Sequence, residues 1–341
     1  MVSKALKAAY CLRPSAYLLM NPLSRLISPR LPPAAVGLGG DGAGVVQLER
    51  RRDAFAVRSA AYVPLPAGLL RPNFDEPNVS DPAELAGALA HLVESAGLAK
   101  RRRWSVALPE AATRTSILTM ESGGVSRAEG EEMLRWKIER TVGAPLEEVR
   151  VSREALAPDS QGRPRHLVSA VRLSVLAEYE SVFASLGWDA GLILPRHMGE
   201  AWWLMREGAG SPDSLLVSSH ADGFTAVILR AGQPLYVRGV ICEVEDRADE
   251  LYRFLLFYRD RDARPEDEGA PPPPVPRERI GRLLVAGPGL DESQAGALVE
   301  ETLSAPPRAV RPEDVRLSFP PAELDFRQMA APAGLAALAW A

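Results

Sequence analysis

Runs of apolar residues divide the chain into two similar series of predicted elements. Each series opens with three short strands separated by polar or glycine-rich turns, a pattern typical of an antiparallel meander. The first three strands are predicted at residues 35–38, 45–48 and 54–63, and the second three at 214–217, 224–229 and 234–240. Helices follow in both series, so the pattern predicts an α/β protein built from two related halves.

Capping residues mark several of the predicted helices. Asp81 stands before Pro82 and a helix to about residue 96, because Asp is a good N-cap and Pro is favoured at the first helical position. Ser126 and Glu129 have the spacing of a capping box, which predicts a helix over residues 126–142. Further helices are predicted at 176–186, 197–206, 244–258 and 292–303, and further strands at 104–108, 113–120, 149–156, 166–173, 190–194 and 283–285.

The predicted elements fall into a tail and two lobes. Residues 1–33 contain five Lys or Arg and no Asp or Glu, which predicts a flexible basic extension able to contact anionic lipid. Residues 34–195 are expected to form the first lobe, with a small inserted subdomain over about 112–175. Residues 196–341 are expected to form the second lobe, with a Pro-rich loop at 263–279. No apolar run approaches the length of about 20 residues that a membrane-spanning helix needs.

Composition narrows the classes of function. The chain has 341 residues, enough for about two domains, and its net charge of -4 gives no reason to expect nucleic-acid binding. Its two cysteines, Cys11 and Cys242, form neither a disulfide framework nor a CxxC metal site, so both are expected to be free thiols. The four histidines do not have metal-ligand spacing, and no metal site is predicted.

Two turns carry residue types that could bind a ligand. Residues 37–42 spell G-x-G-x-x-G, but a dinucleotide site needs a helix to begin there, whereas a strand-like run follows. A glycine-rich hairpin tip can still approach a phosphate closely, and a plain tight turn is the alternative. The second tip, residues 218–223, contains Ser-Ser-His without a nucleophile elbow, so a serine hydrolase is disfavoured.

The order of these segments resembles the PilM-type assembly proteins of type IV pili, which are related to FtsA and to the cytoplasmic part of GspL. The resemblance covers about residues 34–340 and rests on 36–38, 45–49, 106–109, 114–120, 129–149, 177–187, 215–229, 237–238, 251–258, 283–290 and 332–338. It implies an actin-like, ribonuclease H-like duplicated fold. It also implies a cytoplasmic scaffold, peripheral to the inner membrane, that grips the cytoplasmic peptide of a bitopic PilN-like partner.

The resemblance also implies where a nucleotide cleft would lie. Its residues would be Gly39, Gly40, Asp41 and Gly42 at the first phosphate turn, Asp222 and Gly223 at the second, and Gly287 and Gly289 on the adenosine side. The family places an Asp at both strand ends where this chain has Gly39 and Ser218. Because Mg²⁺ prefers carboxylate and phosphate oxygens, losing both predicts a degenerate site without a cofactor.

A second departure from the family lies between Val240 and Val244, where helices completing the second lobe's smaller subdomain are missing. We therefore expect a non-enzymatic scaffold of a pilus or type II secretion-like platform, which binds its peptide by groove filling or strand addition. A functional ATP-binding PilM-like ATPase, with Asp41 and Asp222 holding Mg²⁺, is the alternative. Self-association through exposed Trp202 and Trp203 is weighed against their packing in a helix core.

Overall fold

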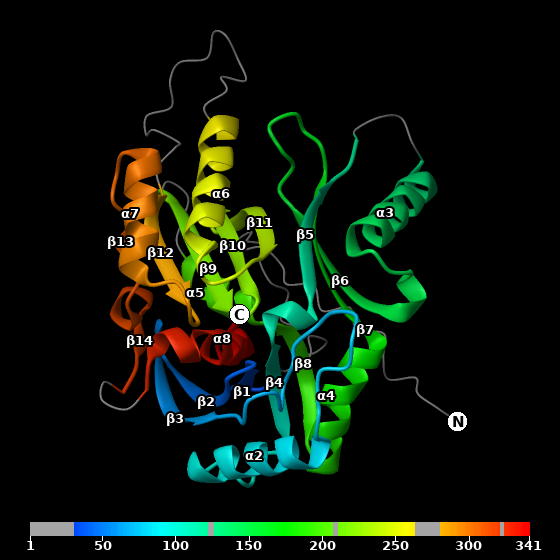
Figure 1. Cartoon of the computed structure of the whole chain (residues 1–341), viewed down its shortest axis with the longest axis vertical. Helices are drawn as coiled ribbons and strands as arrows, with labels where there is room; N and C mark the ends of the chain where they lie inside the picture. The colour runs from blue at the N-terminus through cyan, green and yellow to red at the C-terminus, as the bar shows by residue number, and fades with distance from the viewer. Residues whose placement is uncertain (1–30, 122–125, 207–210, 263–279, 321–323) are drawn as a thin grey trace.

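A six-stranded mixed sheet forms the base of the first lobe (Figure 1). The computed structural model describes residues 31–121, 126–206, 211–262, 280–320 and 324–341, so most of the expected extension, Cys11 and the Pro-rich loop lie outside it. The strand order is β14-β3-β2-β1-β4-β8, with β1, β2 and β3 antiparallel and β1, β4 and β8 parallel. The strands are β1 (Ala34–Leu38), β2 (Gly42–Arg51), β3 (Ala54–Pro64), β4 (Arg103–Leu108), β8 (Asp189–Pro195) and β14 (Leu317–Ser318).

The second sheet repeats the arrangement of the first. Its order is β11-β10-β9-β12-β13, again an antiparallel meander followed by parallel strands. The strands are β9 (Asp213–His220), β10 (Gly223–Arg230), β11 (Gln233–Ile241), β12 (Ile280–Ala286) and β13 (Arg308–Ala309). Strands β3, β2, β1, β4 and β8 of the first sheet therefore correspond in order to β11, β10, β9, β12 and β13 of the second. The two related halves predicted from the hydrophobic pattern are therefore present.

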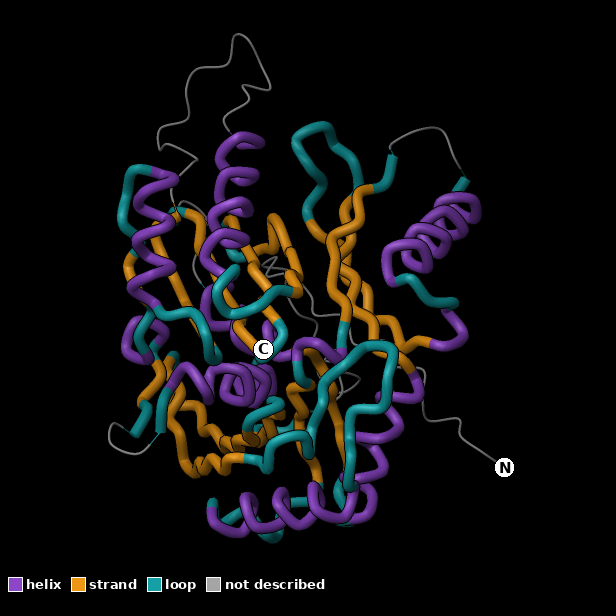
Figure 2. The backbone as a smooth tube through the Cα atoms, viewed as in Figure 1, coloured by secondary structure: helices purple, strands orange, loops and turns teal. Residues whose placement is uncertain are grey.

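Helices form three layers around the two sheets (Figures 1 and 2). Helices α2 (Pro82–Ser95) and α4 (Leu173–Ser185) share a core with one face of the first sheet, and α6 (Arg247–Asp262) and α7 (Glu292–Leu303) with one face of the second. Helices α5 (Arg196–Met205) and α8 (Phe326–Ala337) lie between the sheets in a core shared by both. Because side chains alternate along a strand, Ala35 faces this shared core while Ala34 and Val36 face the outer one.

Helices α5 and α8 cross in backbone contact. A Cβ atom added at Gly334 would lie 1.7 Å from the carbonyl oxygen of Gly199, and one added at Gly199 would lie 2.2 Å from that of Ala331. Trp203 is fully buried at this crossing, where its Nε1 donates to the Ala330 carbonyl at 2.9 Å. The neighbouring Trp202 is half-buried against the same core. The hypothesis of two exposed tryptophan anchors is therefore wrong, and both side chains belong to the helix core.

The expected second lobe, 196–341, includes two elements that lie on the first sheet. Strand β14 pairs in parallel with β3, and α8 packs against β1 and β2. Helix α8 is buried on nearly its whole circumference, as expected of a helix that is apolar all round. The chain therefore returns to the first lobe after completing the second sheet.

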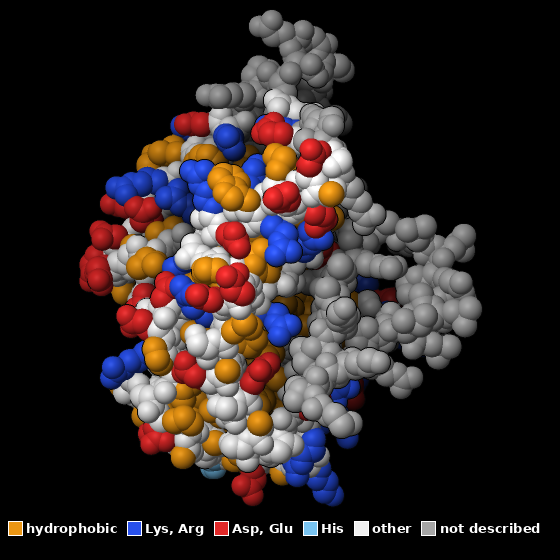
Figure 3. All heavy atoms as spheres, turned by 90° about the vertical axis from the view of Figure 1, so that its right-hand side faces the viewer, with side chains coloured by type: hydrophobic (Ala, Val, Ile, Leu, Met, Phe, Trp, Pro, Cys, Tyr) orange, Lys and Arg blue, Asp and Glu red, His pale blue; other side chains and the backbone are white. Residues whose placement is uncertain are grey.

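A small third sheet forms the inserted subdomain. Its order is β5-β7-β6, from β5 (Arg114–Thr119), β6 (Val149–Leu156) and β7 (Arg165–Arg172), and α3 (Arg127–Val142) packs on it. Helix α3 has the predicted capping box of Ser126 and Glu129 and exposes Trp136. Acidic and basic side chains are interspersed over the described part of this side of the molecule (Figure 3).

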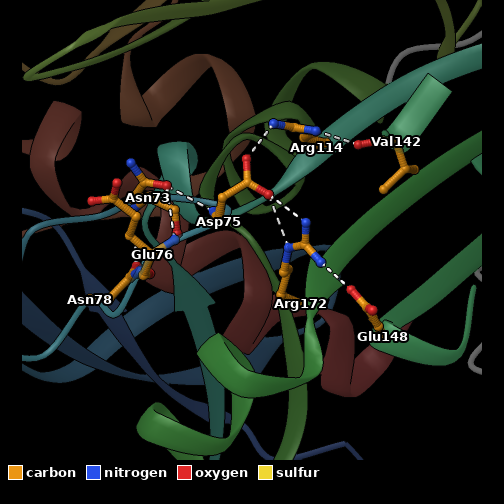
Figure 4. Close-up of polar contacts among 8 residues, drawn as sticks. All are labelled: Asn73, Asp75, Glu76, Asn78, Arg114, Val142, Glu148 and Arg172. Atoms are coloured by element: carbon orange, nitrogen blue, oxygen red, sulfur yellow. Dashed lines mark hydrogen bonds and ion pairs between the residues drawn. The ribbon is translucent and has the colours of Figure 1, made fainter. Parts of the chain in front are cut away.

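The carboxylate of Asp75 links the first lobe to the inserted subdomain at the two places where the chain enters and leaves that subdomain (Figure 4). Asp75 accepts hydrogen bonds from Arg114, where β5 begins, and from Arg172, where β7 ends, at 2.7 to 2.9 Å. Arg172 also pairs with Glu148, and Phe74 is buried in the subdomain core beneath the Arg114 guanidinium. The loop 71–79 therefore fastens the subdomain by a charged network over a buried aromatic ring.

Candidate functional site

A cavity of about 450 Å³ opens between the two lobes. The turn before β2 contributes Asp41, β3 contributes Tyr62, and the first residue of α5 contributes Arg196. The second lobe contributes the turn after β12 and the first turn of α7, and α8 closes the cavity with its first residues. The remaining lining residues are Gly287, Pro288, Gly289, Leu290, Asp291, Gln294, Asp325, Arg327 and Gln328.

The first hairpin tip places one of its four candidate residues on the cavity. The amide of Gly39 donates to the carbonyl of Gly42 at 2.8 Å, which closes a tight turn and leaves Asp41 lining the cavity. Gly42 lies under the Tyr62 ring, since an added Cβ atom would be 2.0 Å from its hydroxyl. Gly40 faces Pro72 instead. Burial and the Asp41 charge raise the pKa of Tyr62.

The second hairpin tip does not reach the cavity. Asp222 and Gly223 are absent from the lining residues. Gly223 has a φ of 146°, and an added Cβ atom would lie 1.9 Å from the Val240 carbonyl oxygen. The Asp222 carbonyl accepts the amide of Cys242, whose half-buried thiol is free and has its pKa raised by burial. The structure therefore brings Asp41 together with Gly287 and Gly289, but not with Asp222.

The turn after β12 is held by a residue that the sequence did not single out. Arg247, the first residue of α6, is 1% exposed, and its terminal nitrogens donate four hydrogen bonds. The acceptors are Ser219 Oγ and the carbonyl oxygens of His220, Ala221 and Pro288, at 2.6 to 2.7 Å. The guanidinium therefore ties the second hairpin tip to the turn containing Gly287 and Gly289.

Arg196, which lines the cavity, belongs to a buried cluster of ionisable side chains that joins α5 to the segment after β4. His197 Nδ1 is 2.5 Å from Glu110 Oε1, and Arg196 lies 3.4 Å from Glu200 Oε1. Burial alone would raise the pKa of Glu110, but the charge and hydrogen bond of His197 outweigh it and lower the value to about 2. Burial opposes the charge on His197, yet Glu110 raises its pKa, and burial raises the pKa of Glu200.

Carboxylates outnumber guanidinium groups around the cavity. Three carboxylates line it, of which Asp291 and Asp325 cap α7 and α8 and so occupy helix N-termini that could otherwise bind an anion. Arg327 is engaged by the carbonyls of Val285 and Leu290. The described residues contain no cluster of three side chains placed to hold a metal ion. Besides Arg327, the cavity is lined by one further guanidinium group, that of Arg196.

Comparison with known proteins places the fold. No protein-family model matches the chain, and no curated protein does. Among solved structures, the PilM–PilN type IV pilus biogenesis complex is similar over 91% of this chain and 98% of that chain, with 21% identity and a TM-score of 0.65. The fold is that of PilM. The actin-like α/β fold expected from the sequence is thereby confirmed, with the duplicated strand order described above.

Two other solved structures are similar at lower scores. A Bacteroides thetaiotaomicron protein with an actin-like ATPase fold has 11% identity and a TM-score of 0.45, over 91% of this chain and 98% of that one. The cytoplasmic domain of EpsL, an inner membrane component of the Vibrio cholerae type II secretion system, has 15% identity and a TM-score of 0.40, over 80% and 94%. Among the described residues, no helix combines the length and apolar composition needed to cross a membrane.

Proposed function

We propose that the chain is a cytoplasmic scaffold of a type IV pilus or type II secretion-like assembly platform. It would dock a cytoplasmic peptide of a PilN-like protein with a single membrane span, and its nucleotide cleft would be non-hydrolytic. The observation that carries the proposal is the match to PilM in its complex with PilN, which extends over 98% of that chain. A match of this extent includes both lobes and the inserted subdomain.

The non-hydrolytic cleft is supported by chemistry at three points. Gly39 and Ser218 stand where the resemblance expects carboxylates to anchor Mg²⁺. Carboxylates outnumber guanidinium groups around the cavity, and one of the guanidinium groups is already bonded to carbonyls. The alternative of an ATP-binding ATPase draws on one observation, which is that Asp41 does line the cavity.

The proposed location is the cytoplasmic face of the inner membrane. Docking on a membrane-anchored partner would hold the scaffold there. The basic residues of 1–33 would add a weak attraction to anionic lipid, of about 1 kcal/mol for each Lys or Arg near the surface. Self-association of the scaffold is a further expectation, but Trp202 and Trp203 would not be its contact residues.

Two titrations of the full chain test the proposal. Calorimetry with the N-terminal cytoplasmic peptide of a PilN-like protein from the same genome should give saturable binding, and a scrambled peptide should give none. Calorimetry with Mg-ATP should give no binding in the micromolar range. Replacing Asp41 and Asp222 with Ala should leave peptide binding unchanged. Absence of peptide binding, or micromolar Mg-ATP binding lost in that double variant, would reverse the assignment.

A further inference from the structure

A buried guanidinium contacts the turn that lines the cavity on its second-lobe side. We infer that Arg247 is a resident side-chain ligand, which holds the second hairpin tip and the turn after β12 together in place of a bound nucleotide. All four of its hydrogen bonds go to uncharged oxygens of these two turns. Burial of a guanidinium without a bonded carboxylate is costly. The four acceptors around its terminal nitrogens therefore indicate a built site, although the buried Nε has no hydrogen-bond partner among the described residues.

The glycines of the turn are required by this side chain and by the backbone of the opposite turn. Gly289 has a φ of 83°, and an added Cβ atom would lie 2.0 Å from Arg247 Nη1. Gly287 has a φ of 81°, and its Cβ atom would lie 1.9 Å from the Ser219 carbonyl oxygen. Both residues resemble the adenosine-side glycines of the PilM-type proteins. In this chain they make room for an arginine and for the opposite turn.

The orientation of the backbone dipoles supports the same assignment. Phosphates bind where backbone N–H groups point at the ligand. Here the carbonyl oxygens of His220, Ala221 and Pro288 point at the guanidinium, and Ser219 Oγ both accepts from Arg247 and donates to Pro288. A phosphate entering this position would meet three carbonyl oxygens and would have to expel a buried side chain. The site is therefore selective for a planar cation.

This inference rests on the proposed function in one respect, because a resident cation explains why the scaffold would work without a nucleotide. The two turns would be fixed from the time of folding. Peptide docking would then be independent of ATP, whereas in a nucleotide-dependent protein these turns would be ordered by the ligand.

Chemical rescue tests the inference. Arg247→Ala leaves four oxygens around an empty space, and the melting temperature should fall by about 5 to 10 °C. Guanidinium at low millimolar concentration should restore at least half of that loss, because a ligand that binds only the native state stabilises it. Methylammonium, which cannot reach four acceptors in one plane, should restore none. The matched control is Arg253→Ala on the same helix, whose side chain is 64% exposed and pairs with Glu250; it should neither lose stability nor respond to guanidinium.

Each outcome bears on the inference. An unchanged melting temperature in Arg247→Ala, or equal rescue by methylammonium, would overturn it. If this variant does not fold, Arg247→Lys is used, and hydrogen exchange should show residues 219–223 and 287–291 losing protection together; unchanged protection would overturn it equally. Micromolar Mg-ATP binding by the wild type would instead contradict the proposed function, even with guanidinium rescue intact.

Discussion

The crossing of α5 and α8 gives a sharp prediction about the joint between the lobes. The variant Gly334→Ala places a Cβ atom 1.7 Å from the Gly199 carbonyl oxygen and 2.6 Å from its carbonyl carbon. Both contacts are with backbone, so no side chain can rotate away, and the helices must separate by more than about 1 Å. Overpacking of this kind costs about 1–3 kcal/mol, and contact with backbone places it at the upper end.

The net effect is smaller because Ala is the better helix former by about 1 kcal/mol. We therefore expect Gly334→Ala to lose about 2 kcal/mol in free energy of unfolding, measured from denaturant midpoints. Gly199→Ala, with its Cβ atom 2.2 Å from the Ala331 carbonyl oxygen, should act in the same direction. The double variant should cost less than the sum, because the same crossing is opened only once.

Gly87→Ala is the matched control for this experiment. Gly87 lies in α2, and an added Cβ atom meets nothing within 4 Å, so only the gain in helix propensity of about 1 kcal/mol remains. If Gly334→Ala were stabilised as much as Gly87→Ala, the two helices would not cross in backbone contact. The shared core between the sheets would then have to be packed differently.

Three further predictions concern the buried cluster, the subdomain joint and the helix core. The pair of Glu110 and His197 should stabilise the folded protein most between pH 4.5 and 6.5. The lowered pKa of the carboxyl group contributes stability in full above pH 4.5, and the raised pKa of the imidazole contributes it in full below pH 6.5. The melting temperature of the wild type should therefore fall more steeply above pH 6.5 than that of Glu110→Gln; parallel profiles would refute the coupling. Asp75→Asn should raise hydrogen exchange in β5 and β7, whereas the control Asp189→Asn, at an exposed pair with Arg103, should not. Trp203→Phe should cost about 1–3 kcal/mol in unfolding experiments by deleting buried volume and the bond to Ala330, and a loss near zero would contradict its burial.

Local signals in the sequence predicted most elements of the fold. The caps at Asp81 and Ser126 are present, and the helix expected at 292–303 has those bounds. Boundaries without a capping signal were less accurate. Helix α4 begins at Leu173 rather than 176, directly after β7, and α6 begins at Arg247 rather than 244 and extends to Asp262.

The site was less predictable because its partners are far apart in the sequence. Glu110 and His197 are separated by 87 positions, and Arg247 and Pro288 by 41. An arginine in the first turn of an amphipathic helix is usually solvated, and nothing local distinguishes one that is buried. The turn containing Gly287 and Gly289 lies after β12, as the sequence predicts, but the resemblance implies a nucleotide beside it and gives no indication of Arg247.

The location of α8 between the two sheets, although it is the last α-helix of the chain, has a consequence for biosynthesis. The first three strands are complete at Pro64, but the helix that covers their inner face ends at Ala337, 273 positions later. At roughly 5–20 residues per second, translation would leave that apolar surface uncovered for tens of seconds. A nascent chain in this condition is a substrate for ribosome-associated chaperones, and its yield in cells should depend on them more than on the stability of the finished protein.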